Sequence, residues 1–133
     1  MSLMEPGANK VRFAVVGLGN IAQTAVLPAF SQADGNCELT KLISDDGDKL
    51  RTLASHYRAS HVFDQRRYEE ALMSGAFDAI YIALPNDLHC EFAVKAAQHK
   101  IHVLCEKPMA ISEEQCSRMI KASEDNNVKL MIA

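Results

Sequence analysis

The sequence predicts an α/β fold in which helices cover both faces of a doubly wound parallel sheet of about six strands. Apolar segments of strand length alternate with helix-like segments along the chain. The segment from Ala79 to Leu84 is apolar at successive positions, as expected for a strand that is covered on both faces. A glycine-containing turn, residues 17–22, follows the first strand directly, which is typical of a βαβ unit.

The hydrophobic pattern alternates between the two kinds of element over the whole length of the chain. It predicts strands at residues 11–16, 39–43, 61–63, 79–83, 102–105 and 129–132, and helices at residues 20–32, 47–57, 67–74, 88–99 and 112–126. We find no linker, internal repeat or low-complexity segment after residue 10.

Local signals support the individual helices. In the first helix, Pro28 is expected to bend or shorten the element, and Gly35 with Asn36 to close it. Gly75 is expected to end the third helix, and Ser112 with Gln115 to form a capping box at the start of the fifth. Apolar residues share one face of the second helix (Leu50, Leu53, Tyr57) and of the fourth (Phe92, Ala93, Ala96, Ala97).

Composition narrows the class of protein. The 133 residues, 48% of them hydrophobic, suffice for one domain with an ordinary core. A formal net charge of -3 without a basic stripe argues against nucleic acid as a partner. The longest apolar run falls far short of the roughly 20 residues that cross a bilayer, so we expect no membrane partner. Without a signal peptide, the expected location is the cytoplasm.

Residues 1–10 are expected to be a disordered leader or an expression scar, with the folded domain at residues 11–133. The cysteines are widely spaced and form no Cys-x-x-Cys pair, which favours reduced thiols and predicts no metal site (Cys37, Cys90, Cys105, Cys116). Cys105 is interpreted as a packing residue rather than a nucleophile. Neither the Arg66-Arg67 pair nor four of the histidines shows a pattern of partners (His56, His61, His99, His102).

The turn after the first strand has the pattern Gly-x-Gly-x-x-Ala, which predicts a dinucleotide site. Gly17 permits the tight turn, Gly19 lets backbone approach a pyrophosphate, and Ala22 lets the helix pack on the strand. The unpaired amides of the helix start would face the phosphates. The candidate phosphate-binding residues are Gly17, Leu18, Gly19, Asn20, Ile21 and Ala22. The alternative is a plain α/β turn, since glycines occupy such turns in many proteins that bind nothing.

Three motifs in order resemble the Gfo/Idh/MocA family of oxidoreductases, the glucose-fructose oxidoreductase and inositol dehydrogenase group. They are the glycine turn 17–22, Pro85-Asn86-Asp87-Leu88-His89, and Glu106-Lys107-Pro108-Met109-Ala110. The resemblance covers nearly all of residues 11–133. It implies a Rossmann domain that binds NAD or NADP, followed in full-length members by a second α/β domain that binds a sugar or polyol and forms the homo-oligomer.

That second domain has no counterpart here, so we expect a truncated chain. The family's catalytic Asp-x-x-x-His arrangement has no match in the sequence. The resemblance therefore implies a fragment that binds coenzyme but is itself inactive, from a parent enzyme that transfers a hydride between nicotinamide and a CH–OH group.

The resemblance assigns the catalytic role to Lys107, which would reach the nicotinamide and the reacting hydroxyl. A cation at the carboxyl edge of the sheet can polarise a carbonyl or lower the pKa of a hydroxyl. By position alone, Lys107 reads as a solvated lysine at a strand end. Pro108 biases Lys107 away from α geometry, and Glu106 either orients the ammonium or pairs with it.

Leu84, Pro85 and Asn86 follow the fourth strand, where the strand order reverses in this topology, so the Asn86 amide is a candidate for the nicotinamide ribose or carboxamide. The alternative for Asn86 is capping of the following helix. His89 matches the histidine of the family motif beside the coenzyme, but a histidine in a first helical turn is more often structural.

Coenzyme choice is expected to depend on the end of the second strand. Ser44 stands where NAD-specific domains place an acid, and its hydroxyl tolerates a 2′-phosphate that Lys49 could reach. Asp45 and Asp46 argue for NAD, by repelling that phosphate or by binding the ribose diol. Together these residues slightly favour NADP over NAD as the coenzyme.

Two other functions fit the same residues. One is a reductase of a non-sugar substrate within the same broad family, such as a biliverdin reductase or dihydrodiol dehydrogenase. The other is a non-catalytic NAD(P)-sensing regulatory module. Lys107 weakens the sensor interpretation, because a sensor needs the pyrophosphate turn but no cation at the hydride-transfer face.

Overall fold

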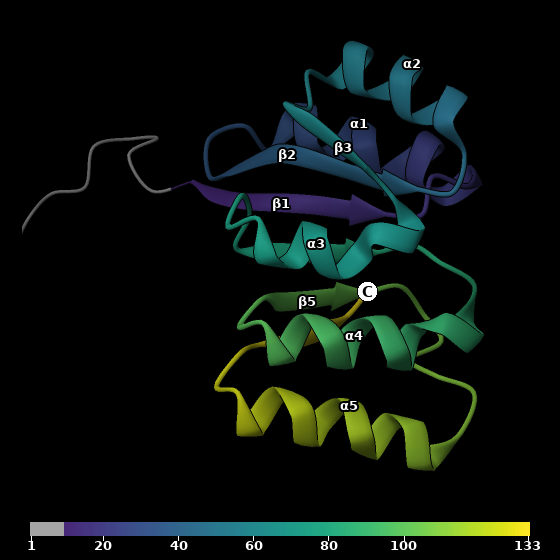
Figure 1. Ribbon diagram of the computed structural model, residues 1–133, viewed down its shortest axis with the longest axis vertical. Coiled ribbons are helices and arrows are strands. Elements are labelled where there is room, and N and C mark those ends of the chain that lie inside the picture. The colour runs from purple at the N-terminus through teal and green to yellow at the C-terminus, as the bar shows by residue number, and fades with distance from the viewer. Residues whose placement is uncertain (1–9) are drawn as a thin grey trace, which may run out of the picture.

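The computed structural model describes residues 10–133, and its core is one sheet of six parallel strands in the order β3-β2-β1-β4-β5-β6. The strands are β1 (Val11–Val16), β2 (Cys37–Ser44), β3 (His61–Asp64), β4 (Ala79–Ile82), β5 (His102–Cys105) and β6 (Leu130–Ile132). The predicted doubly wound sheet is confirmed (Figure 1). The predicted leader lies outside the described residues except for Lys10.

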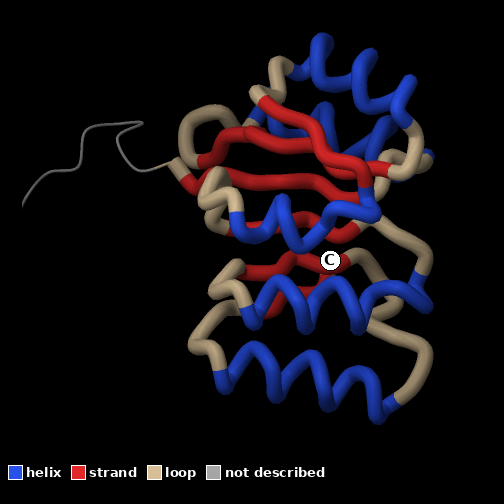
Figure 2. The backbone as a smooth tube through the Cα atoms, in the orientation of Figure 1, coloured by secondary structure: helices blue, strands red, loops and turns tan. Residues whose placement is uncertain are grey.

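Helices connect every pair of consecutive strands. They are η1 (Ala22–Val26) and α1 (Leu27–Gln32), α2 (Gly47–Tyr57), η2 (Gln65–Arg67) and α3 (Tyr68–Met73), η3 (Asn86–Leu88) and α4 (His89–Gln98), and α5 (Glu113–Asp125). In Figure 2 the helices lie in two layers, on either side of the red strands.

Each face of the sheet carries its own hydrophobic cluster. One cluster joins the sheet to α3, α4 and α5 and includes Val16, Ile82 and Met119. The other joins the opposite face to η1, α1 and α2 and includes Val15 and Leu50. Alternate residues of β1 therefore enter different clusters, which explains why its central residues are apolar without interruption.

The first helical segment differs from the prediction. We expected one α-helix over residues 20–32, but Ala22–Val26 forms a π-helical turn in which the Leu27 amide donates to the Ala22 carbonyl. Pro28 lies just beyond this turn. Proline has no N–H, and in an α-helix its ring would clash with the carbonyl four residues back. The widened turn accommodates both constraints.

The predicted helix ends are partly correct. Helix α1 ends at Gln32 with Ala33 as its C-cap, so Gly35 and Asn36 belong to the following turn and do not close the helix as expected. Gly75 follows α3 with a φ of 69° and ends that helix as predicted. At α5 the Ser112 hydroxyl accepts from the Gln115 amide at 3.2 Å, but the Gln115 side chain reaches Ile111, so only half of the capping box forms.

The strand order reverses between β1 and β4, which lie side by side at the centre of the sheet. The loops after these two strands therefore leave the carboxyl edge next to each other and turn in opposite directions. This edge of a doubly wound sheet is where ligands bind.

Candidate functional site

The glycine turn is anchored between two neighbouring strands. Gly17 donates its amide to the Ile43 carbonyl at 2.9 Å, and the Ala83 amide donates to the Val16 carbonyl at 2.9 Å. Gly17 has a φ of 93°, and a Cβ at this position would lie 2.5 Å from the Ala83 carbonyl oxygen. Only glycine meets both conditions, so the protein's own packing requires Gly17.

Gly19 behaves differently. A Cβ at Gly19 would meet no protein atom within 4 Å, and the residue is exposed. The following residues open a helix, whose first amides have no acceptor within the helix. The Gln23 side chain donates a hydrogen bond to the Leu18 carbonyl at 2.7 Å and so stabilises the turn. Open space in front of a helix start fits a bound anion.

A cavity of about 290 Å³ lies at this carboxyl edge. Eight of the residues predicted for the site line it, namely Gly17, Leu18, Gly19, Ser44, Asp45, Lys49, Leu84 and Pro85. They come from the loops after β1, β2 and β4 and from the start of α2. The structure therefore brings three separate sequence segments around one hollow.

Three further residues line the cavity and were missed from the sequence, namely Gln65, Ala83 and Leu88. Gln65 is the first residue after β3, so the rule that ligands bind at the carboxyl edge was a signal for it. Leu88 lies inside the Pro85–His89 motif, and its apolar side chain has no polar group from which contact with a ligand could be predicted. Ala83 was assigned to the fourth strand only.

At the end of β2, hydrogen bonds show which of Asp45 and Asp46 has a carboxylate available to a ligand. The Asp46 carboxylate accepts the amides of Asp48 and Lys49 at 3.1 Å and so caps α2. Ser44 is buried, and its hydroxyl accepts the Asp46 amide at 3.1 Å. Asp45 and Lys49 are both exposed and both line the cavity. Asp46 is thus occupied by the helix, while Asp45 and Lys49 face the hollow with opposite charges.

The remaining predicted site residues lie beyond this hollow. Asn20 and Ile21 are exposed at the start of the helix, and Ala22 is fully buried against the sheet. Asn86 is exposed, and its side chain makes no hydrogen bond within residues 10–133. The capping role considered for Asn86 is absent, since α4 has Leu88 at its N-cap without a side-chain bond.

His89 is buried behind the site, with 1% of its surface exposed. Its Nε2 lies 2.9 Å from the Leu84 carbonyl oxygen, and its Nδ1 lies 2.9 Å from the Pro108 carbonyl oxygen. The ring therefore sits between the Pro85 turn and the Lys107-Pro108 turn, and any influence on a ligand passes through these two turns.

The Glu-Lys-Pro segment leaves β5 at the same edge. The Tyr81 hydroxyl donates a hydrogen bond to the Glu106 carboxylate. Lys107 is exposed, and within residues 10–133 it forms no ion pair, so the pairing considered as one of two roles for Glu106 is not present. Cys105 is buried, and burial, followed by the charge of Glu106, raises the pKa of its thiol to about 12. This agrees with a packing role for Cys105.

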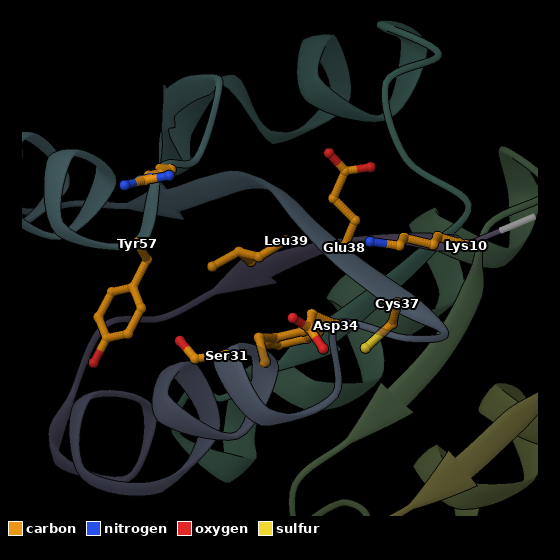
Figure 3. Close-up of a pocket in the computed structure, with 9 residues that line it drawn as sticks. Lys10, Ser31, Asp34, Cys37, Glu38, Leu39 and Tyr57 are labelled. Atoms are coloured by element: carbon orange, nitrogen blue, oxygen red, sulfur yellow. The ribbon is translucent and has the colours of Figure 1, made fainter. Parts of the chain in front are cut away.

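A second hollow lies at the opposite, amino edge of the sheet (Figure 3). Its walls combine acidic and basic side chains, among them Lys10, Asp34, Glu38 and Arg58, with Cys37 and Tyr57. None of the residues predicted for the site lines it. Within residues 10–133 no group of three or more histidine, cysteine or acidic side chains could hold a metal ion. No helix in this part of the chain is both long and apolar enough to cross a membrane.

The strand order, the parallel sheet and the glycine turn at its central crevice define a nucleotide-binding domain of the Rossmann class. The model of the Gfo/Idh/MocA oxidoreductase family, NAD-binding Rossmann fold, matches residues 11–133. The chain belongs to this family, and residues 11–133 correspond to its NAD-binding Rossmann domain.

Two curated relatives are 35% and 37% identical to this chain over the aligned residues. The NADP-dependent D-xylose 1-dehydrogenase of Haloarcula marismortui is 35% identical over 94% of this chain and 35% of its own length. The NADP-dependent scyllo-inositol 2-dehydrogenase of Bacillus subtilis is 37% identical over 92% of this chain and 36% of its own length. The chain thus spans about a third of these curated relatives.

Among solved structures, the WlbA dehydrogenase of Bordetella pertussis in complex with NADH and UDP-GlcNAcA superposes with a TM-score of 0.85. It is 30% identical, and the match covers 94% of this chain and 35% of that one. Relatives of this domain thus include proteins named for NADP and a protein solved with NADH.

Proposed function

We propose that the carboxyl-edge cavity binds a nicotinamide dinucleotide, with NADP(H) preferred, and that the parent protein oxidises or reduces a CH–OH group of a sugar or polyol. The contrast between the two glycines supports this proposal most directly. Packing explains Gly17, whereas Gly19 lines the carboxyl-edge cavity and no protein atom there excludes a side chain. A pyrophosphate lying on residues 17–22 explains the glycine, because the phosphates need the space in front of the helix amides.

The adenosine half of the coenzyme fits the β2 side of the cavity. The Ser44 hydroxyl and the Lys49 ammonium are suited to a 2′-phosphate, and Gln65 offers an amide on the neighbouring loop. Asp45 opposes the phosphate, but Asp46 does not compete because it caps α2. The names of the two NADP-dependent relatives support the same preference.

The nicotinamide half fits the β4 and β5 side, where Leu84, Pro85 and Asn86 follow β4 and Lys107 follows the neighbouring β5. When bound, the coenzyme supplies the hydride chemistry. The chain's contribution is to bind and orient it, and to place the unpaired Lys107 ammonium where it stabilises negative charge on a reacting oxygen. Asn86 has free amide donors and an acceptor for the ribose or the carboxamide.

The substrate class rests on the relatives, whose names cite xylose and inositol. We propose that the 133 residues alone bind coenzyme without turnover, because the Asp-x-x-x-His arrangement that the family resemblance assigns to acid–base catalysis is not among them. A homo-oligomeric parent, assembled through a second domain, is part of the same proposal.

Titration of the chain with NADPH and NADH, followed by nicotinamide fluorescence, tests the binding. Gly19→Ala should fold normally and raise the Kd at least about tenfold, because its Cβ enters the space assigned to the pyrophosphate. Gly35→Ala is the matched control, since a Cβ there also meets no protein atom within 4 Å, at the other edge of the sheet. Equal coenzyme affinity of the Gly19 and Gly35 variants would contradict the assignment.

A further inference from the structure

The Glu106 carboxylate lies on one defined face of the sheet. In the parallel pairing of β4 with β5, Tyr81 is opposite Leu104 and Ile82 is opposite Cys105. The Glu106 amide donates to the Ile82 carbonyl at 3.0 Å, so the ladder continues one residue beyond β5. Because side chains alternate along a strand, Glu106 projects to the same face as Leu104 and Tyr81. Glu106 is two residues beyond Leu104, the residue opposite Tyr81, and its side chain reaches the Tyr81 hydroxyl.

The Tyr81 hydroxyl uses this geometry and donates to the Glu106 Oε2. Burial, and then the hydrogen bond to Glu106, raise the pKa of Tyr81, so the phenol stays a proton donor across the physiological range. A hydrogen bond to an ionised acceptor is roughly twice as strong as one between neutral groups. Glu106 therefore has a fixed partner of its own.

Lys107 is the next residue, and its ammonium is the cation nearest to Glu106 in the sequence. Lys107 lies in a bend just beyond β5, and Pro108 disfavours α geometry at Lys107. An exposed lysine with a flexible stem still pairs with a neighbouring free carboxylate, although such a pair contributes little. In this structure Lys107 is exposed and unpaired within residues 10–133, while Glu106 is bound to Tyr81.

We propose that Tyr81 is a positioning residue for Lys107: by holding the Glu106 carboxylate in a hydrogen bond on the Tyr81 face of the sheet, it keeps the Lys107 ammonium unpaired at the ligand-binding edge. The proposal rests on the function proposed above for Lys107, since an ammonium that is neutralised by Glu106 stabilises a reacting oxygen less. Glu106 then serves the fold of the turn and does not orient the ammonium.

Competitive labelling of the chain with acetic anhydride tests the proposal without requiring activity. Only the unprotonated amine reacts, and pairing with a carboxylate holds the proton on the nitrogen. Tyr81→Phe releases Glu106, so labelling of Lys107 should fall about threefold, the size of a weak ion pair. The exposed Lys49 and Lys129 in the same sample are internal standards, and Tyr57→Phe is the matched control on another half-buried tyrosine.

Glu106→Gln removes the charge but keeps an acceptor for the Tyr81 hydroxyl. Combined with Tyr81→Phe it should return Lys107 labelling to the wild-type level, which a general loosening of the turn would not do. Unchanged labelling in Tyr81→Phe, or no recovery in the double variant, overturns the proposal. Failure of the wild-type chain to bind either coenzyme contradicts the proposed function instead, and the labelling result still decides the role of Tyr81.

Discussion

The backbone of Gly17 packs directly against Ala83, so that a Cβ at position 17 would lie 2.5 Å from the Ala83 carbonyl oxygen. Because these residues directly follow the two central strands, this contact sets how closely the glycine turn approaches the loop after β4. The same contact forms one wall of the cavity, which both residues line. Packing of the core and the shape of the candidate site are therefore determined together at this point.

Gly17→Ala should destabilise the protein by about 3 kcal/mol, the sum of a left-handed backbone angle that alanine resists and a clash with rigid backbone. That is a large share of the 5–15 kcal/mol typical of a domain. Urea unfolding followed by far-ultraviolet circular dichroism measures the change. Gly35→Ala should stay within about 0.5 kcal/mol of the wild type. A Gly17→Ala protein as stable as the wild type would show that the turn has room to move.

His89 gives a second stability prediction, since its ring nitrogens face the carbonyls of Leu84 and Pro108. His89→Leu keeps most of the volume but offers no donor, so the part-buried carbonyl that accepts from the ring N–H loses its partner at a cost of about 2 kcal/mol. His89→Gln retains a donor and should lose less. Hydrogen exchange should show faster opening of both turns in the leucine variant. Faster exchange in only one of them would mean that the ring holds only that turn.

The sequence predicted the elements best where local signals and burial agree. Helix α2 runs over Gly47–Tyr57 and β5 over His102–Cys105, both as predicted, because Asp46 caps the helix and β5 pairs with a strand on each side. The π-helical turn was missed because it is a compromise between Pro28 and packing of the helix on the sheet, which no local pattern encodes.

The candidate site likewise has features that simple rules predict and features that depend on tertiary structure. The loops after β1, β2 and β4 were predicted to meet because parallel strands share a carboxyl edge, and they line one cavity. Tyr81 and Glu106 are 25 residues apart, and His89 and Pro108 are 19 apart. These pairs depend on strand register and on side-chain direction, so the motifs named the residues without showing their partners.

Lys41 gives a prediction for the dependence of stability on pH. Its side chain is buried on β2 with the His61 ring nitrogen as its partner, and desolvation lowers the pKa of the ammonium below 10.5. Between the folded pKa and 10.5 the unfolded chain binds more protons, so the free energy of unfolding rises with pH in that window. Below the folded pKa the ammonium is charged in the folded protein, and the full free-energy penalty for burying that charge lowers the stability.

Lys41→Met should therefore stabilise the protein at neutral pH, by on the order of 1 kcal/mol, since a buried polar group is replaced by an apolar one of similar length. The gain should shrink as the pH approaches 10.5. Urea unfolding at several pH values measures it, with the exposed Lys129→Met as the control that stays flat. A gain that grows with pH would mean that the buried ammonium is not the source of the effect.

Coenzyme choice gives the last prediction, because Lys49 and Asp45 line the cavity with opposite charges. Lys49→Ala should raise the Kd for NADPH about fivefold through loss of an ion pair with the 2′-phosphate, and leave the Kd for NADH within about twofold. Asp45→Asn should tighten NADPH binding, because it removes a repelling charge, and should weaken NADH binding if that carboxylate holds the ribose diol. Arg51→Ala, exposed on the same helix but outside the cavity, is the control. Parallel fluorescence titrations with NADPH and NADH measure these changes. An equal loss of affinity for both coenzymes in Lys49→Ala would place the lysine away from the 2′-position. The physical basis for preferring NADP would then be removed.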